Sequence, residues 1–184
     1  MRGLGTLVNV IHPYVGFHDH TPTQVGLDYY ARIVEAANKA GVMLGFENVE
    51  GEEYLAALMQ RFWNEPCLGF CYDSGHELCY NEGRDMLALY GKKLCHTHLN
   101  DNLGIADGVI SPANDLHLMP GDGIADWPSI MKRIRDTGYS DILMCELLYT
   151  DRPGKNGITH KFSELSLEEF LTLALQKLQA VVAL

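Results

Sequence analysis

Leu44-Gly45-Phe46-Glu47 is the first of four similar stretches; the others are Leu68-Gly69-Phe70-Cys71-Tyr72-Asp73, Lys93-Leu94-Cys95-His96-Thr97-His98 and Asp141-Ile142-Leu143-Met144-Cys145-Glu146. Each is a short, mostly apolar run that ends in a carboxylate or an imidazole. This pattern is typical of a parallel strand that is buried along its length and presents one polar group at its carboxyl end. Strands of this kind, side by side, predict a ring of Glu47, Asp73, His98 and Glu146. Such a ring suits a divalent cation such as Mn²⁺, Mg²⁺, Co²⁺ or Zn²⁺.

The composition predicts one globular domain over residues 1–184. Of the 184 residues, 47% are hydrophobic and 21% are charged, which is ordinary for a chain with its own core. The 14 Lys and Arg against 24 Asp and Glu give a formal charge of −10. An acidic surface repels nucleic acid and anionic membranes, so we expect neither as a partner. No apolar run approaches the ~18 residues of a membrane span.

The five cysteines are odd in number and include no Cys-x-x-Cys pair. Cys71, Cys95 and Cys145 lie inside the apolar stretches quoted above. Free cysteine is among the most often buried residue types, and disulfides are rare in the cytosol. We therefore expect buried, reduced thiols in a cytoplasmic protein.

Strand-like runs alternate with stretches of helical periodicity along the chain. The strands are expected around residues 6–11, 42–47, 68–73, 94–98, 115–119 and 142–146. A helix is expected to be capped by Thr21 and to end at Gly41. Further helices are expected over residues 52–62, 84–90 and 127–137, and a last one after a loop from Thr150 to Ser163, capped by Ser166.

This alternation, with about 30 residues per unit, predicts a parallel sheet. Ligand-type residues at the carboxyl ends of successive strands are typical of (β/α)₈ barrels. No Gly-x-Gly-x-x-Gly follows the first strand, which argues against a dinucleotide-binding fold. A complete barrel needs ~250 residues, whereas this chain has 184. The predicted fold class is therefore α/β, an incomplete TIM (β/α)₈-type barrel of about six βα units.

Two strand-end glutamates, Glu47 and Glu146, indicate acid–base chemistry. A metal held between them can orient a hydroxy-carbonyl substrate. One glutamate can then remove a proton from the carbon next to the carbonyl and the other can return one, while the metal stabilises the enediolate charge.

Histidines accompany the ring. Asp73-Ser74-Gly75-His76 places an imidazole three residues after a strand-end aspartate, across a glycine turn, where it would face the substrate. In His96-Thr97-His98 both rings project from one face of the strand. His98 lies nearer the carboxyl end and is the expected ligand, whereas His96 is either a core histidine or a partner that supports a ligand.

Two further positions could reach the same site. In Asp115-Leu116-His117 the acid and the imidazole again have period-two spacing, so the pair could bind a second metal or the substrate, or form a polar loop before the turn at Pro120. His12 ends the first strand and could also face the site.

Five motifs resemble the xylose isomerase-like TIM-barrel superfamily, which groups sugar phosphate isomerases and epimerases, ketose 3-epimerases, hydroxypyruvate isomerases and endonuclease IV. They are GFENVEG (45–51), CYDSGH (71–76), CHTHLNDN (95–102), DLHLMPGDGIADW (115–127) and LMCELLY (143–149). Their order and spacing agree over nearly the whole chain. Measured against the superfamily, the chain starts near the third strand and lacks the first two βα units.

The resemblance implies an activity and a set of site residues. Glu47, Asp73, His98 and Glu146 would be the metal ligands, and Glu47 and Glu146 the catalytic acid–base pair. His76, together with His12, Asp115, His117 and Glu53, would bind a small sugar or sugar phosphate. We expect a sugar isomerase or epimerase of carbohydrate metabolism with one divalent ion, Mn²⁺ before Mg²⁺, Co²⁺ or Zn²⁺.

Two alternatives stay open. The site residues also fit the trinuclear zinc pattern of endonuclease IV, a phosphodiesterase acting on abasic DNA, although the loops 48–54, 74–85 and 99–114 are acidic or neutral and lack the basic character that a phosphate backbone attracts. The chain could also be a non-catalytic, truncated metal-binding protein. Because an open sheet exposes edge strands, we expect a homo-oligomer or a partner chain that completes the barrel.

Overall fold

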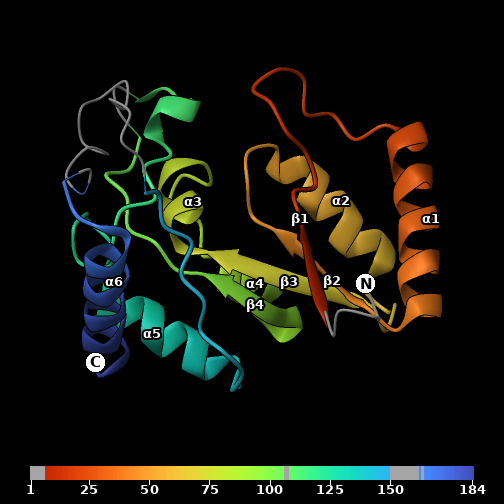
Figure 1. The fold of residues 1–184 in the computed structure, drawn as a ribbon. Coiled ribbons are helices and arrows are strands. Elements are labelled where there is room, and N and C mark those ends of the chain that lie inside the picture. Colours follow the sequence, from red (N-terminus) through yellow and green to blue (C-terminus); the bar gives the residue numbers. More distant parts are fainter. Residues whose placement is uncertain (1–6, 106–107, 150–161, 163) are drawn as a thin grey trace.

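A computed structural model describes residues 7–105, 108–149, 162 and 164–184. Its strands form one parallel sheet in the order β1-β2-β3-β4, with bounds Val8–Ile11, Met43–Glu47, Leu68–Asp73 and Leu94–His98. Each strand pairs with the next one along the chain (Figure 1). The edge strands β1 and β4 also approach each other, so the sheet is strongly curved. This parallel half-barrel of four strands confirms the predicted incomplete TIM-type barrel.

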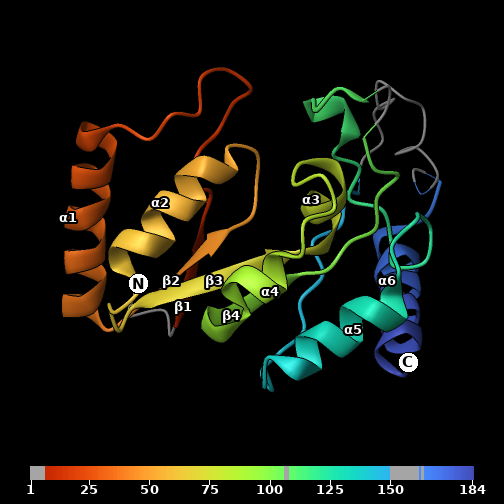
Figure 2. The same ribbon diagram turned by 180° about the vertical axis from the view of Figure 1, so that it is seen from behind.

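Helices follow the strands in the expected alternation. Their bounds are Gln24–Ala40 (α1), Glu52–Phe62 (α2), Ser74–Cys79 (α3), Met86–Tyr90 (α4), Trp127–Asp136 (α5) and Leu167–Val182 (α6), with short 3₁₀ turns at Gly91–Lys93 (η2) and Pro112–Asn114 (η4). Seen from behind, α1 and α2 lie on one side of the molecule and α5 and α6 on the other (Figure 2). None of the helices in the described part of the chain has the length and apolar character needed to cross a membrane.

The helix ends follow local chemistry, with one correction. Ser166 caps α6 as predicted and forms a capping box with Glu169, and Gly41 ends α1 in the left-handed conformation with φ of 64°. The expected cap at Thr21 is wrong. Thr23 is the N-cap of α1, because its hydroxyl accepts the backbone N–H of Gly26 at 3.1 Å.

The outer face of the sheet carries the large apolar side chains. Phe46, Phe70 and Tyr72 are fully buried and alternate with residues of the opposite face. Helix side chains cover them in one core: Val34, Ala37, Leu55, Leu58, Met59, Met86, Trp127, Ile130 and Ile134. The burial of this face against the helices holds the sheet in place.

The inner face of the sheet carries small and polar residues. Gly45 and Glu47 of β2 share it with Cys71 and Asp73 of β3. The register between β3 and β4 shifts after Phe70, which pairs with Leu94, whereas Asp73 pairs with His98. This bulge re-aims the end of β4. As a result, Asp73 and His98 lie directly opposite each other at the carboxyl ends of their strands.

The expected strand at residues 115–119 is wrong. Leu118 alone forms a bridge, and it is antiparallel to Asp101. His117 has φ of 45°, in the left-handed region, which interrupts an extended backbone. This turn keeps the segment from joining the sheet but leaves His117 beside the carboxyl ends of the strands.

The expected strand at residues 142–146 is wrong as a regular strand, although the segment lies beside β4. Leu99 forms a single parallel bridge with Cys145. The Thr97 hydroxyl accepts the backbone N–H of Met144 at 2.9 Å and donates to its carbonyl at 3.3 Å. A side chain of β4 thus replaces the missing ladder bonds. Most of the predicted loop from Thr150 to Ser163 lies outside the described residues.

Arg133 joins α5 to the elements that follow β3. Its guanidinium donates to both carboxylate oxygens of Glu77 in α3, at 2.7 and 3.1 Å, and to Asp85 at 2.9 Å. It also donates to the hydroxyl of the fully buried Tyr72 at 3.3 Å. Glu77 itself is almost fully buried. Arg133 therefore supplies the cation that a buried carboxylate beneath α3 requires.

We expect Arg133→Ala to lower the free energy of unfolding by about 2–4 kcal/mol, because it leaves the buried Glu77 without its cation. Urea unfolding followed by circular dichroism measures the change. Lys132→Ala is the matched control: its pair with Asp136 is exposed, so the loss should stay below about 0.5 kcal/mol. Equal losses in the two variants would contradict a special role for Arg133.

Candidate metal centre

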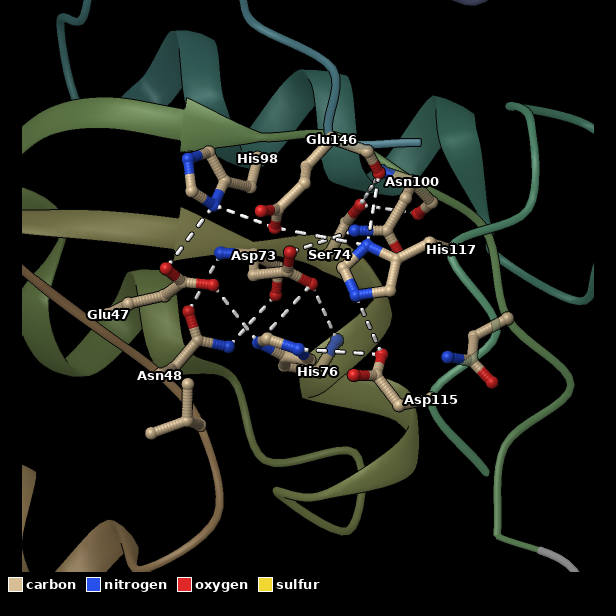
Figure 3. A network of polar contacts seen from close by, with 12 residues as sticks. Glu47, Asn48, Asp73, Ser74, His76, His98, Asn100, Asp115, His117 and Glu146 are labelled. Carbon is tan, nitrogen blue, oxygen red and sulfur yellow. Dashed lines mark hydrogen bonds and ion pairs between the residues drawn. The ribbon is translucent and has the colours of Figure 1, made fainter. Parts of the chain in front are cut away.

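Four side chains from separate elements converge at the carboxyl ends of the strands (Figure 3). Glu47 ends β2, Asp73 ends β3, His98 ends β4, and Glu146 lies on the segment beside β4. One ligand atom from each lies within 4.8 Å of the others. The structure thus brings together the four residues that the sequence predicted as one ring.

His98 lies between the two glutamates. Its Nδ1 is 3.2 Å from Glu47 Oε2 and 3.0 Å from Glu146 Oε2. Glu47 is fully buried, whereas 43% of the Glu146 side chain is exposed. One carboxylate therefore faces the protein interior and the other faces the opening of the site.

The buried donors are not satisfied by hydrogen bonds. Both oxygens of Glu47 and the Nδ1 atoms of His76 and His98 have no hydrogen-bond partner among the described residues. Imidazole nitrogens come within 3.1–3.4 Å of Glu47 without the alignment of a hydrogen bond. Oxygen and nitrogen atoms that converge on one point without well-aligned hydrogen bonds are what a divalent cation requires. The oxygen and nitrogen donors therefore fit such an ion.

The carboxylates and imidazoles shift each other's pKa values. Burial by itself would raise the pKa of Glu47, but His12, His76 and His98 outweigh it and hold that pKa well below its usual range. Burial opposes a charged imidazole, yet Glu146 and Glu47 raise the pKa of His98 to about 10. Without a metal the site balances its carboxylates with protons on imidazoles. A dication would supply the same positive charge.

Asp73 is held by residues from both neighbouring strands. Burial raises its pKa to about 6. Its Oδ1 accepts the backbone N–H of His76 at 2.6 Å, which makes it the N-cap of α3, and its Oδ2 accepts Asn100 Nδ2 at 2.8 Å. Asn48 bonds to both the N–H and the carbonyl of Asp73, each at 2.8 Å. These bonds fix the strand end that presents the carboxylate.

The sequence did not single out the asparagines. Asn48 directly follows β2, Asn100 lies two residues after the end of β4, and both are fully buried. Asn100 also exchanges two hydrogen bonds with Ser74, at 2.6 and 3.0 Å. A Cβ at Gly75 would lie 1.8 Å from Asn100 Oδ1, so glycine is required there. The two asparagines each lie just after an apolar run, within two residues of the predicted ligands Glu47 and His98. This position is the signal that could have identified them.

A second group lies beside the first. Ligand atoms of His76, Asp115 and His117 lie within 4.8 Å of one another. Asp115 Oδ1 is 3.1 Å from His117 Nε2 and 3.5 Å from His76 Nε2. His117 Nδ1 lies 3.1 Å from the backbone oxygen of Glu146. The glycine turn expected between Asp73 and His76 is the first turn of α3, which points His76 between the two groups.

The other predicted residues differ in their placement. His12 Nε2 lies 3.4 Å from Glu47 Oε2, so the end of β1 reaches the centre. Glu53 is on α2 with 68% of its side chain exposed, and its carboxylate lies 3.9 Å from Nδ1 of His20. None of the contacts of the described residues joins Glu53 to the metal-type groups. The structure brings His12 into the centre and does not bring Glu53 there.

The chain matches the family described as xylose isomerase-like TIM barrel over residues 3–165. The chain belongs to this family. The match extends through β1–β4 and the segment that carries Glu146, so it includes all the residues of both groups. The resemblance inferred from the five motifs is confirmed.

Individual relatives are longer than this chain. The uncharacterized protein y4fM of Sinorhizobium fredii is 37% identical over 91 residues, which are 48% of this chain and 27% of that protein. A crystal structure of the IolI protein with bound zinc superposes with a TM-score of 0.74 at 21% identity, covering 98% of this chain and 64% of that one. A D-tagatose 3-epimerase-like protein gives 0.60 at 23%, covering 95% and 66%. The two structures show that the fold is shared, and the chain spans less than two thirds of each relative.

We expect a divalent ion to stabilise the fold. At a concentration about a hundredfold above the dissociation constant, binding adds about 2.7 kcal/mol, which corresponds to a rise in Tm of about 5–10 °C for a chain of this size. Differential scanning calorimetry with Mn²⁺ or Zn²⁺, and with EDTA as the reference, measures the shift. Glu47→Gln should abolish it, and the exposed Glu53→Gln should retain it. A full shift in Glu47→Gln would exclude Glu47 as a ligand.

Asn48→Ala should destabilise the protein by about 2–4 kcal/mol, because it leaves buried polar groups of Asp73 and Asn81 without partners. Asn64→Ala, in the turn after α2, is the control and should change the free energy of unfolding by less than about 0.5 kcal/mol. Urea unfolding in EDTA separates this loss from any change in metal binding. A loss that appears only when metal is present would contradict a direct structural role.

Proposed function

We propose that the chain is a metal-dependent sugar isomerase or epimerase that transfers a proton at the carbon next to a carbonyl. The observation that carries the proposal is a pair of carboxylates that both contact Nδ1 of His98, at 3.2 Å from Glu47 and 3.0 Å from Glu146, with Glu47 buried and Glu146 partly exposed. Membership of the xylose isomerase-like family supports it, as does the likeness to a D-tagatose 3-epimerase-like protein. A more general assignment, that the chain is a sugar-modifying member of this family, is supported by the family match and not by the role of any single residue.

Each carboxylate has a role in the proposed reaction. Contact with His98 lowers the pKa of Glu146, so it is ionised at neutral pH and can accept a proton from a substrate in the opening. Glu47 contacts the same Nδ1 atom of His98 from the buried side of the site, at 3.2 Å, and would return a proton to the substrate. A bound divalent ion, held by Glu47, Asp73, His98 and Glu146, would polarise the carbonyl and stabilise the negative charge of the enediolate.

The second group gives the substrate polar partners. His76 and His117 flank Asp115 next to the carboxylate pair. Imidazoles can donate to or accept from the hydroxyls of a small sugar or sugar phosphate. His12, beside Glu47, would close the site from the side of β1. Because the four described strands form an open half-barrel with edge strands, we further propose that a second copy or a partner chain completes the wall around the substrate.

The same second group favours one other function. Two ligand groups side by side are the arrangement that metal-dependent phosphodiesterases use for in-line displacement. Incision of a duplex with an abasic site, without exchange of sugar C–H protons into deuterated water, would identify that activity. The formal charge of −10 weighs against a polyanionic substrate, so the isomerase or epimerase remains the proposal.

Glu146→Gln tests the mechanism. It should reduce turnover on the responsive substrate of a ketose and aldose panel by at least about 10³-fold, because it removes the base, while much of the metal is retained. Proton exchange followed by NMR measures turnover, and metal analysis measures occupancy.

Glu35→Gln on α1 is the control, since Glu35 forms an exposed pair with Lys39. It should behave as the unchanged protein does. Full activity in Glu146→Gln would exclude the two-glutamate mechanism. Metal binding without turnover on the whole panel, in a preparation with its oligomeric state determined, would favour a non-catalytic metal-binding chain.

A further inference from the structure

A layer of glycines and thiols lies on the inner face of the sheet, beneath the metal-type residues. A Cβ added at Gly69 would lie 2.2 Å from Cys95 Sγ, and one added at Gly45 would lie 3.2 Å from the same sulfur and 3.5 Å from Cys71 Cβ. The glycines therefore leave the space that the two thiols occupy. The inner face of this half-barrel thus carries two cysteines next to its glycines, where barrel interiors usually carry branched apolar side chains.

Cys71 lies closest to the candidate ligands. It precedes Asp73 by two residues on β3, so both side chains are on the inner face, and it pairs with Glu47 across the strands. It is fully buried. Its Sγ, a carboxylate oxygen of Glu47 and a ring nitrogen of His98 all lie within 4.8 Å of one another. The thiol is thus the inward neighbour of the ring that faces the opening.

We propose that Cys71, Glu47 and His98 form a second ligand set, for thiophilic divalent ions such as Zn²⁺, Co²⁺ and Cd²⁺. This set shares Glu47 and His98 with the four-residue set that also contains Asp73 and Glu146. The inference rests on the metal centre of the proposed function. Hard ions such as Mn²⁺ and Mg²⁺ take the carboxylate-rich set. Softer ions move inward and exchange Asp73 and Glu146 for the sulfur of Cys71.

The free lone pairs of the shared residues permit both positions. Both oxygens of Glu47 and Nδ1 of His98 are buried without hydrogen bonds among the described residues. The contacts of these atoms, at 3.0–3.4 Å, are between carboxylates and imidazoles, and a bound dication would replace them in either set. Asp73, in contrast, is fixed by Asn100, Asn48 and the N-terminus of α3, so the ion moves and the aspartate does not.

Binding at the inner position is balanced by loss of a proton. The thiolate is the form of cysteine that binds metal. As the bond between sulfur and metal forms, the S–H bond breaks and the proton passes to solvent, with no change of oxidation state. Sulfur selects Zn²⁺, Co²⁺ and Cd²⁺ over Mg²⁺ and Mn²⁺ because it is a soft, polarizable donor. The identity of the ion would thus decide whether Glu146 is a ligand or a free base.

Absorption spectroscopy of the full chain loaded with Co²⁺ tests this assignment. A thiolate ligand adds an intense charge-transfer band in the near ultraviolet to the weaker visible bands that Co²⁺ shows with any donors. We expect that band in the unchanged protein and in Cys67→Ser, and its loss in Cys71→Ser and Cys71→Ala. Cys67 is a matched control, since it is a buried thiol at the opposite end of β3 that contacts the Val34 carbonyl.

Titration calorimetry gives the companion readout. Cys71→Ser should weaken Cd²⁺ binding by roughly tenfold or more and change Mn²⁺ binding by less than about twofold, because only the soft ion uses the sulfur. X-ray absorption of the Zn²⁺-loaded unchanged protein needs no variant, and it should show one sulfur at about 2.3 Å from the metal.

The outcomes separate this assignment from the proposed function. Co²⁺ binding with visible bands but no charge-transfer band, or a band that persists in Cys71→Ser, overturns the inner set and leaves the outer centre intact. If the band is lost in Cys95→Ser and not in the Cys71 variants, the sulfur ligand is Cys95, and the role of Cys71 is overturned. Failure of the unchanged protein to bind any of these ions overturns both the inner set and the metal-dependent function.

Discussion

The charge of the buried Glu47 carboxylate is the constraint on which this structure depends. A carboxylate taken out of water costs several kcal/mol unless opposite charge or hydrogen bonds replace the solvent. Glu47 has no hydrogen bonds among the described residues, and imidazoles of His12, His76 and His98 lie 3.1–3.4 Å from its oxygens. Positive charge must therefore balance it, either as protons on histidines or as a metal ion. A structural carboxylate is normally satisfied by hydrogen-bond donors, so this contrast supports the proposed metal site.

The rest of the fold keeps this centre in register. Parallel strands bring their carboxyl ends to one edge, and the helices on the outer face supply the buried apolar area that stabilises the sheet. The asparagines that follow β2 and β4 then bind the end of β3 from both sides. Arg133 ties α5 to the base of α3, the helix that carries His76. Apolar packing thus stabilises the sheet, and hydrogen bonds fix the positions of the side chains at its carboxyl edge.

The proposed reaction and the proposed metal preference depend on one geometry. Two carboxylates beside His98 support the proposal of proton transfer, and a thiol beneath them supports the proposal of a soft-ion position. The same glutamate and histidine belong to both arrangements. The curved sheet has only four strands among the described residues, and one of the two glutamates is at its open side. A surface that closes this side would lower the dielectric around the substrate and strengthen every charge interaction in the site.

The sequence by itself determined the strands β2 to β4, the helix α2, the Ser166 cap of α6 and the residues of the ring. The spacing of apolar residues and the polar residue at the end of each strand are patterns within a short stretch of chain, so they can be read without the tertiary structure. Only the tertiary structure decided the rest. The left-handed backbone of His117 and the Thr97 contact to Met144 turned two expected strands into single bridges. The roles of Asn48, Asn100 and Cys71, and the distance of Glu53 from the centre, depend on contacts between residues far apart in the chain. No local pattern carries that information, since such contacts exist only once the sheet has curved.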